Sequence, residues 1–101
     1  MGTVDNSIPR PYLRLPDDDG TYIATTQSGS TYVFDLKHRT VTRTPGPDSH
    51  PDMHDGQRTL RSIIQCEVGV SGYWTMQPDD FTVDYYWQLT SPIVSIEEQR
   101  F

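Results

Sequence analysis

The feature that most constrains the fold is the alternation of apolar and polar residues between Thr21 and Thr44. Successive side chains of a β-strand point to opposite faces, so a period of two predicts strands rather than helices. Ser28-Gly29 and His38-Arg39 are expected to form two-residue hairpin loops between three such strands. These two loops place five apolar residues on one face of the sheet: Ile23, Tyr32, Phe34, Leu36 and Val41.

A charged residue also falls on this apolar face. The second loop places Arg43 opposite Phe34. In one interpretation the stem of Arg43 lies over Phe34 at the sheet margin and its guanidinium reaches water or an acid, while stacking on Tyr32 or Phe34 adds ~0.5–2 kcal/mol. In the other, Arg43 is held by a buried carboxylate such as Glu67 or Asp35, or presents its planar fork to an anionic partner.

The middle of the chain predicts a loop and one more strand. Residues 46–58 form a polar loop after Pro45-Gly46, which ends the preceding strand. From Thr59 onward, a short helix and a strand are competing predictions. In the strand interpretation, Gly69 marks a bulge, and the alternating residues that share one face are Ile64, Cys66, Val68 and Val70.

The last third predicts a second hairpin. The stretches YWTMQ and FTVDYYWQL flank a turn at Pro78-Asp79-Asp80, and Pro92 is expected to interrupt the chain before a final short strand, IVSIEE. Alternation then gives one long apolar face, which we expect in the core; its residues are Phe81, Val83, Tyr85, Trp87 and Leu89.

Prolines at positions 9, 11 and 16 predict an extended N-terminal arm over residues 1–20, followed by a single β domain over 21–101. A chain of 101 residues supports one hydrophobic core. The fold class is therefore all-β, as a small antiparallel barrel or a two-layer sandwich of six to seven strands.

Charge and cysteine content exclude several functional classes. The net charge is −6 and the pI is near 4.7, whereas a surface that follows nucleic-acid phosphates needs a dense basic stripe. Cys66 is the only cysteine, so no intrachain disulfide is possible and a cytoplasmic location is the simpler prediction. Neither a signal peptide nor a membrane-spanning run is visible, so no membrane partner is expected.

Four short motifs carry a family resemblance. They are SGS-x-Y at the first turn, DL before the second, TVTR-x-PG after it and TSP-x-V-x-I near the end, and together they cover about a third of the chain. With these motifs the chain resembles small β-rich proteins of actinobacteria and their phages. The resemblance implies a bacterial or phage origin and a single β domain, and it implies no activity.

The densest group of metal-ligating residue types lies between Asp48 and Asp55. Here His50, Asp52 and His54 provide nitrogen and oxygen atoms that suit Zn²⁺. A solvated polar loop is the favoured interpretation, because Pro51 disrupts the helical turn that would bring the two histidines to one face. There is no G-x-S-x-G motif, no phosphate-binding glycine loop and no catalytic Cys–His context. We therefore expect no enzyme and no cofactor.

The aromatic pairs of the second hairpin provide a candidate binding surface. If Tyr85 and Trp87 fill the core, Tyr86 must point outward, flanked in sequence by Asp84 and Gln88. With Tyr73 and Arg43 these residues predict a surface for an unidentified protein partner, because tyrosine and arginine are enriched at interfaces. The predicted function is a non-enzymatic interaction module. The alternatives are a subunit of a homo-oligomer or phage structural assembly, and a metal-dependent enzyme that uses the 48–55 loop.

Overall fold

A computed structural model describes residues 7–15, 18–47, 56–78 and 82–99. Within these ranges there is no helix, and the chain forms seven β-strands. Their bounds are β1 Ser7–Pro9, β2 Thr21–Thr26, β3 Thr31–Asp35, β4 Thr40–Thr44, β5 Gly56–Gln65, β6 Ser71–Met76 and β7 Tyr86–Gln99.

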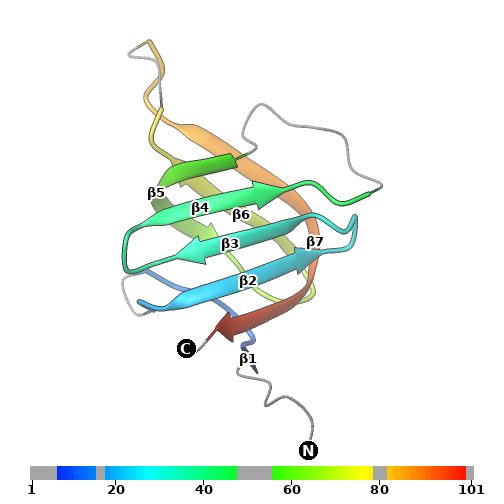
Figure 1. The fold of residues 1–101 in the computed structure, drawn as a ribbon. Coiled ribbons are helices and arrows are strands. Elements are labelled where there is room, and N and C mark those ends of the chain that lie inside the picture. Colours follow the sequence, from blue (N-terminus) through cyan, green and yellow to red (C-terminus); the bar gives the residue numbers. More distant parts are fainter. Residues whose placement is uncertain (1–6, 16–17, 48–55, 79–81, 100–101) are drawn as a thin grey trace, which may run out of the picture.

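Six of these strands close into an antiparallel barrel, so the all-β prediction is confirmed in its barrel form (Figure 1). The order is β7-β2-β3-β4-β5-β6, and β6 pairs again with β7 to close the ring. The long strands β5 and β7 make closure possible, since each pairs with different neighbours along its length. The additional strand β1 pairs with the C-terminal end of β7.

Two predictions about strand boundaries are wrong. Pro92 lies inside β7, which runs for 14 residues rather than ending before it. Proline is tolerated here because β7 changes partner at this point: its residues up to Pro92 pair with β6, and those from Ile93 pair with β2. The competing helix from Thr59 is also wrong, because Thr59 lies within β5, which begins at Gly56 inside the predicted polar loop.

The loop between β2 and β3 is one residue longer than predicted. Thr26 N donates to Ser30 O at 3.0 Å and Gly29 N donates to Thr26 O at 2.9 Å, which encloses a loop of Gln27, Ser28 and Gly29. Gly29 has φ of +89°, the left-handed conformation that glycine adopts most readily. Three-residue hairpin loops of this kind are common, and they shift the pairing by one residue relative to a two-residue loop.

That shift reverses the faces of β2. Tyr22 pairs with Phe34, whereas Ile23 pairs with Val33. Tyr22 and Ala24 are therefore buried, and Ile23 is half-buried on the outer side. The prediction that Ile23 and Phe34 share a face is wrong, because one residue of register moves every side chain of a strand to the other side of the sheet.

The β3–β4 hairpin differs from the prediction by two residues, which preserves the faces. Phe34 pairs with Val41 and Asp35 with Thr40, so Leu36 lies in a four-residue turn that ends at Arg39 with φ of +56°. Leu36, Phe34 and Val41 are all buried, as is Tyr32, and the prediction for these residues is confirmed.

Trp74 of β6 is fully buried at the centre of the barrel. Its ring meets Tyr32 with 4.9 Å between centroids and Phe34 with 4.8 Å, in both cases edge to face. This is a favourable geometry for aromatic pairs. From the N-terminal arm, Leu13 closes the core: it is buried, and its N–H donates to Cys66 O at 2.9 Å.

The predicted apolar face after Thr59 is wrong for three of its four members. Cys66 is buried, but Ile64, Val68 and Val70 are exposed. Register shifts in the β5–β6 pairing explain the change, since each shift interrupts the regular alternation of side chains. Gly69 lies in a turn rather than a bulge, with φ of +99°.

Candidate docking face on β6 and β7

The N-terminal half of β7 has its apolar side chains outside and its polar side chains inside. Trp87 and Leu89 are 55% and 57% exposed, whereas Gln88 and Thr90 are buried. Tyr85 and Val83, which precede the strand, are also exposed. The prediction that this apolar series fills the core is therefore wrong, and its remaining member, Phe81, lies outside the described residues.

The pairing with β6 sets this orientation. Trp74 pairs with Gln88 and Met76 pairs with Tyr86, and directly paired residues point to the same side of a sheet. Because Trp74 and Met76 fill the core, Gln88 and Tyr86 are turned inward beside them. Trp87 must then point outward.

These outward residues form what we call the aromatic face: Tyr73, Tyr85, Trp87 and Leu89, with Arg61 at one end. Tyr73 pairs directly with Leu89, and the Tyr73 and Trp87 rings meet at 6.3 Å between centroids. Thr75, which pairs with Trp87, is only 2% exposed although its neighbour Tyr73 points outward. Its hydroxyl is hydrogen-bonded to that of Ser62, so this polar group is already satisfied beneath the aromatic side chains.

A cation lies at one end of the aromatic face. The guanidinium carbon of Arg61 is 4.7 Å from the centre of the Tyr85 ring, a cation–π contact. Arg61 is exposed, and no carboxylate of the described residues forms an ion pair with it. The face therefore combines exposed tryptophan, tyrosine and leucine side chains with one accessible positive charge.

The predicted binding residues divide between the two sides of the barrel wall. Tyr73 belongs to the aromatic face, and Asp84 is exposed beside Tyr85. Gln88 is 7% exposed, and Tyr86 is half-buried against the core, with the Arg58 guanidinium 5.1 Å from its ring centre. The prediction that Tyr86 and Gln88 point outward is therefore wrong, and the pattern missed Trp87, Leu89 and Arg61.

Arg43 lies on the inner side of β4, where it pairs with Tyr32 rather than with Phe34. Its Nε donates to the Tyr32 hydroxyl at 3.2 Å, and one terminal nitrogen donates to Ser30 Oγ at 3.3 Å. The carboxylate of Asp35 accepts from the His38 ring at 2.8 Å instead, and Glu67 is exposed on a bridge to Tyr12. Arg43 is thus part of the barrel interior near its rim, apart from the aromatic face.

The sulfur and metal candidates contribute no site within the described ranges. Burial raises the pKa of the Cys66 thiol to about 12, so the thiol stays protonated and weakly nucleophilic at neutral pH. The predicted metal ligands His50, Asp52 and His54 lie outside the described residues. Among the residues that are described, no three His, Cys, Asp or Glu side chains gather closely enough to hold a metal ion.

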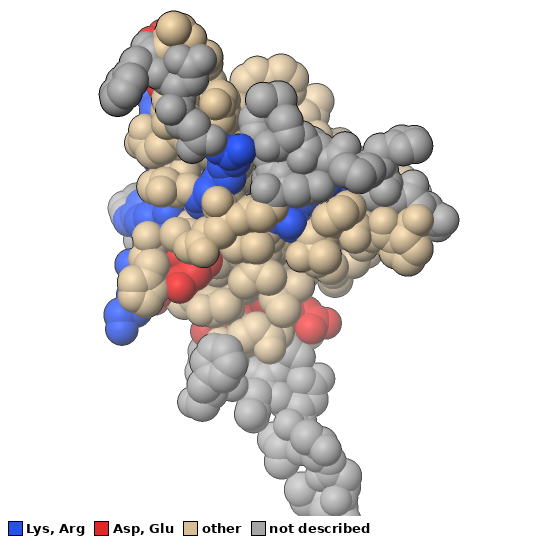
Figure 2. Space-filling model, turned by 45° about the horizontal axis from the view of Figure 1, so that its top comes forward, with Lys and Arg blue, Asp and Glu red and all other residues tan. Residues whose placement is uncertain are grey.

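On the side shown in Figure 2, the surface of the described residues is mostly uncharged, and their basic and acidic side chains lie in separate groups without a continuous basic stripe. Such a stripe is what nucleic-acid binding without sequence preference requires. The described part of the chain contains no helix with the length and apolar character needed to cross a membrane.

Comparison with known proteins gives no relative for this chain. No family model matches it, and no curated protein or solved structure matches it either. The resemblance to small actinobacterial and phage proteins therefore stays a prediction.

Proposed function

We propose that this protein is a non-enzymatic interaction module that docks a partner protein on the aromatic face. The observation that carries the proposal is the exposure of Trp87 and Leu89, two residues apart on one strand and each more than half exposed. Large contiguous apolar groups are uncommon on the surface of monomeric proteins and often belong to interaction sites. Tyr73 extends the same surface across the neighbouring strand.

The composition of the aromatic face favours a protein as its ligand. Tryptophan, tyrosine and arginine dominate the residues that contribute most to binding at protein interfaces. Tyr85 and Arg61 are in cation–π contact with each other, so less side-chain entropy is lost when a partner contacts them. The inward polar groups of β7 do not take part, because the core covers them.

Arg61 indicates the chemistry of the partner. An exposed guanidinium at the end of an apolar surface is complemented by a carboxylate next to apolar side chains, and such pairs increase specificity and the rate of association. We therefore propose a partner segment that combines aromatic or aliphatic residues with Asp or Glu. A second copy of the chain is disfavoured by the net charge of −6 that each copy carries.

A selection experiment tests the proposal. Peptides displayed on phage are selected against the intact protein, and the binders are mapped by amide chemical shifts. We expect selected peptides to combine apolar residues with Asp or Glu and to shift the amides of Tyr73, Trp87 and Leu89. Leu89→Asp should weaken binding at least tenfold, and Arg61→Glu should do so by a similar factor, equivalent to about 1.4 kcal/mol.

The matched control is Arg39→Glu, which makes the same change at an exposed turn residue between β3 and β4. This variant should bind the selected peptides as the wild type does. Peptides whose affinity survives Leu89→Asp, or a selection that yields no binders, would contradict the proposal. Sedimentation showing a dimer that Leu89→Asp dissociates would assign the face to a second copy instead.

The other predictions attached to this function remain expectations. A cytoplasmic location and a bacterial or phage origin are expected from cysteine content and sequence resemblance. The alternative of a metal-dependent enzyme uses the 48–55 loop, which lies outside the described residues.

A further inference from the structure

The first half of β7 has a neighbouring strand on one edge only, within the described part of the chain. β6 pairs with β7 as far as Pro92, whereas β2 pairs with it from Ile93 onward. The last backbone contact on the β2 edge is from Gln27 N to Pro92 O at 2.8 Å. Among the described residues, 87–90 therefore pair with β6 alone, and we call their opposite side the open edge.

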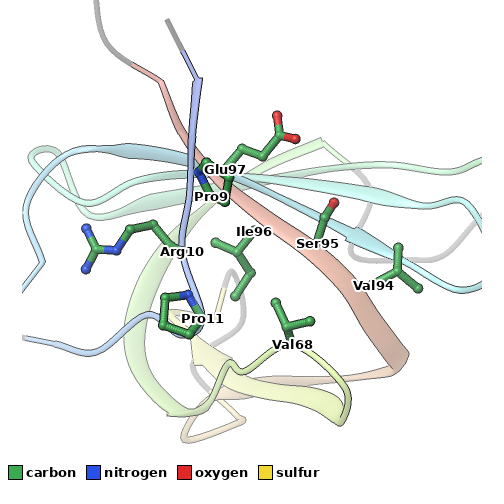
Figure 3. Close-up of a pocket in the computed structure, with 8 residues that line it drawn as sticks. All are labelled: Pro9, Arg10, Pro11, Val68, Val94, Ser95, Ile96 and Glu97. Carbon is green, nitrogen blue, oxygen red and sulfur yellow. The ribbon is translucent and has the colours of Figure 1, made fainter.

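The second half of β7 is covered on both edges, which shows that β6 and β2 lie on opposite edges of the strand. Thr26 of β2 pairs with Ile93 from one edge, and Ile93 N donates to Val70 O at 2.9 Å on the other. β6 begins directly after Val70 and continues along that second edge. Figure 3 shows the covered half, with Pro11 of the arm and Val68 of the turn beside β7.

Two hydrogen bonds of β6 show which of its residues face β7. The N–H and C=O groups of successive residues in a strand point to alternate edges. Gln77 N donates to Thr59 O of β5 at 2.9 Å, and Gly72 N donates to Thr90 Oγ1 of β7 at 2.8 Å. The even-numbered residues of β6 therefore direct their main-chain groups to β7.

The same alternation assigns the main-chain groups of β7. Trp74 is an even-numbered residue and pairs with Gln88, so these two residues exchange hydrogen bonds. Trp87 and Leu89, on either side of Gln88, must then direct their N–H and C=O groups to the open edge. The described residues provide one contact there, from Gln88 Nε2 to Leu89 O at 3.4 Å, which is longer than the roughly 2.7–3.2 Å of most such bonds.

The open edge lacks the features that keep other strands from pairing with an edge. Natural proteins protect edge strands with charged residues, prolines or bulges. The outer strand β1 has only three residues and ends in Pro9. Residues 87–90 are Trp, Gln, Leu and Thr, with neither a charge nor a proline, and two of their side chains are more than half exposed. Such an edge is a template for another strand.

We infer that the partner segment binds as an added β-strand along the open edge. Its main chain exchanges hydrogen bonds with Trp87 and Leu89, and the side chains of the residues paired with them lie on the aromatic face. In β-strand addition the main chain provides affinity and alternate side chains provide specificity. This inference rests on the proposed function and adds the conformation of the partner segment, which is extended with apolar residues at every second position.

Matched N-methylated peptides test the inference. The probe is Ac-EVTVTVT-NH2, titrated into the ¹⁵N-labelled intact protein; one version is N-methylated at its three valines and another at its three threonines. Valines that lie on the aromatic face beside Trp87 and Leu89 direct their N–H groups to β7, so methylating them should weaken binding at least tenfold. Methylating the threonines, whose N–H groups point to solvent, should change the affinity less than twofold.

Hydrogen exchange tests the open edge itself. In the free protein the amides of Trp87 and Leu89 should exchange at least tenfold faster than that of Gln88, which is bonded to β6. Saturating probe should slow the exchange of Trp87 and Leu89 at least tenfold. Slow exchange of these two amides in the free protein, equal effects of the two methylated sets, or no protection by the bound probe would overturn the inference.

The outcome is distinguishable from failure of the proposed function. If the phage-selected peptides lose affinity in Leu89→Asp but leave the exchange of Trp87 and Leu89 unchanged, the aromatic face docks a partner without an added strand, and the inference alone is wrong. If the selection yields no binders while the valine-methylated probe is the weaker one and the unmethylated probe protects both amides, the inference stands and the selected class of partner is wrong.

Discussion

The β3–β4 hairpin and the β6–β7 pair belong to the same barrel, yet their outer surfaces differ. In the hairpin the buried side chains are apolar, among them Phe34 and Val41, while the outer side of β4 carries threonines. In the β6–β7 pair the outer side carries Trp87 and Leu89, and the inner side of β7 carries Gln88. When the outer side of a strand is apolar, the alternation of its residues does not show which side faces the core. The same exposed apolar side is the one that can bind a partner.

The two tryptophans provide the sharpest test of this difference. Trp74→Ala should lower the free energy of unfolding by about 3–5 kcal/mol, because it removes the ring between Tyr32 and Phe34 and leaves a cavity. Trp87→Ala should lower it by less than about 1 kcal/mol, because the side chain is more than half exposed. Urea denaturation measures both values. Equal losses, or a larger loss for Trp87→Ala, would mean that the orientation of β7 is wrong.

The inner polar side of β7 gives a second, smaller contrast. Thr90 Oγ1 accepts from Gly72 N at 2.8 Å and donates to Ser91 O at 2.7 Å, so Thr90→Val should cost about 1–2 kcal/mol by leaving a buried N–H unsatisfied. Gln88 Oε1 is buried and has no hydrogen-bond partner among the described residues. Gln88→Met should therefore be neutral or should stabilise the protein by up to about 1 kcal/mol. Urea denaturation also measures these two changes in the free energy of unfolding. A loss above about 1 kcal/mol for Gln88→Met would contradict the prediction that this substitution is neutral or stabilising.

The smallest expected effect lies in the turn of the β3–β4 hairpin. The hydrogen bond from the His38 ring lowers the pKa of Asp35, so the folded state favours the carboxylate. This contribution is present above the unfolded pKa near 3.9 and is lost as the pH falls through the lower folded pKa. Asp35→Asn should cost a few tenths of a kcal/mol at pH 6, since the pair is partly exposed, and the difference should disappear as the pH falls through the folded pKa of Asp35. If the difference in unfolding free energy between the wild type and Asp35→Asn grows as the pH falls, the predicted direction of the pKa shift is wrong.

The sequence predicts the fold class well because alternation and short turns are local properties. The β3–β4 hairpin keeps its faces even though its loop differs, since a slip of two residues returns each side chain to its own side. The prediction of the β2–β3 register failed because the same residues fit a two-residue loop and a three-residue loop equally well. Gly29 suits a two-residue loop and a three-residue loop alike, and only packing decides that Tyr22 rather than Ile23 faces Phe34.

The candidate site was harder to predict for a related reason. The sequences around Trp74 and Trp87 alternate in a similar way. Which tryptophan is buried depends on contacts with distant strands, here the packing of Trp74 against Tyr32 and Phe34. Gly72 is the one local indication that Trp74 is buried. A Cβ atom added at Gly72 would lie 2.5 Å from the Trp74 ring, so the ring needs a glycine two positions before it on the same face of β6.

The most direct test of the account is the solvent accessibility of each tryptophan alone. Acrylamide quenching of fluorescence is measured in Trp74→Phe, which retains Trp87, and in Trp87→Phe, which retains Trp74. We predict efficient quenching and red-shifted emission for the protein that retains Trp87, and blue-shifted, weakly quenched emission for the protein that retains Trp74. The reverse assignment would place the aromatic face inside the barrel and would leave no docking surface on β6 and β7.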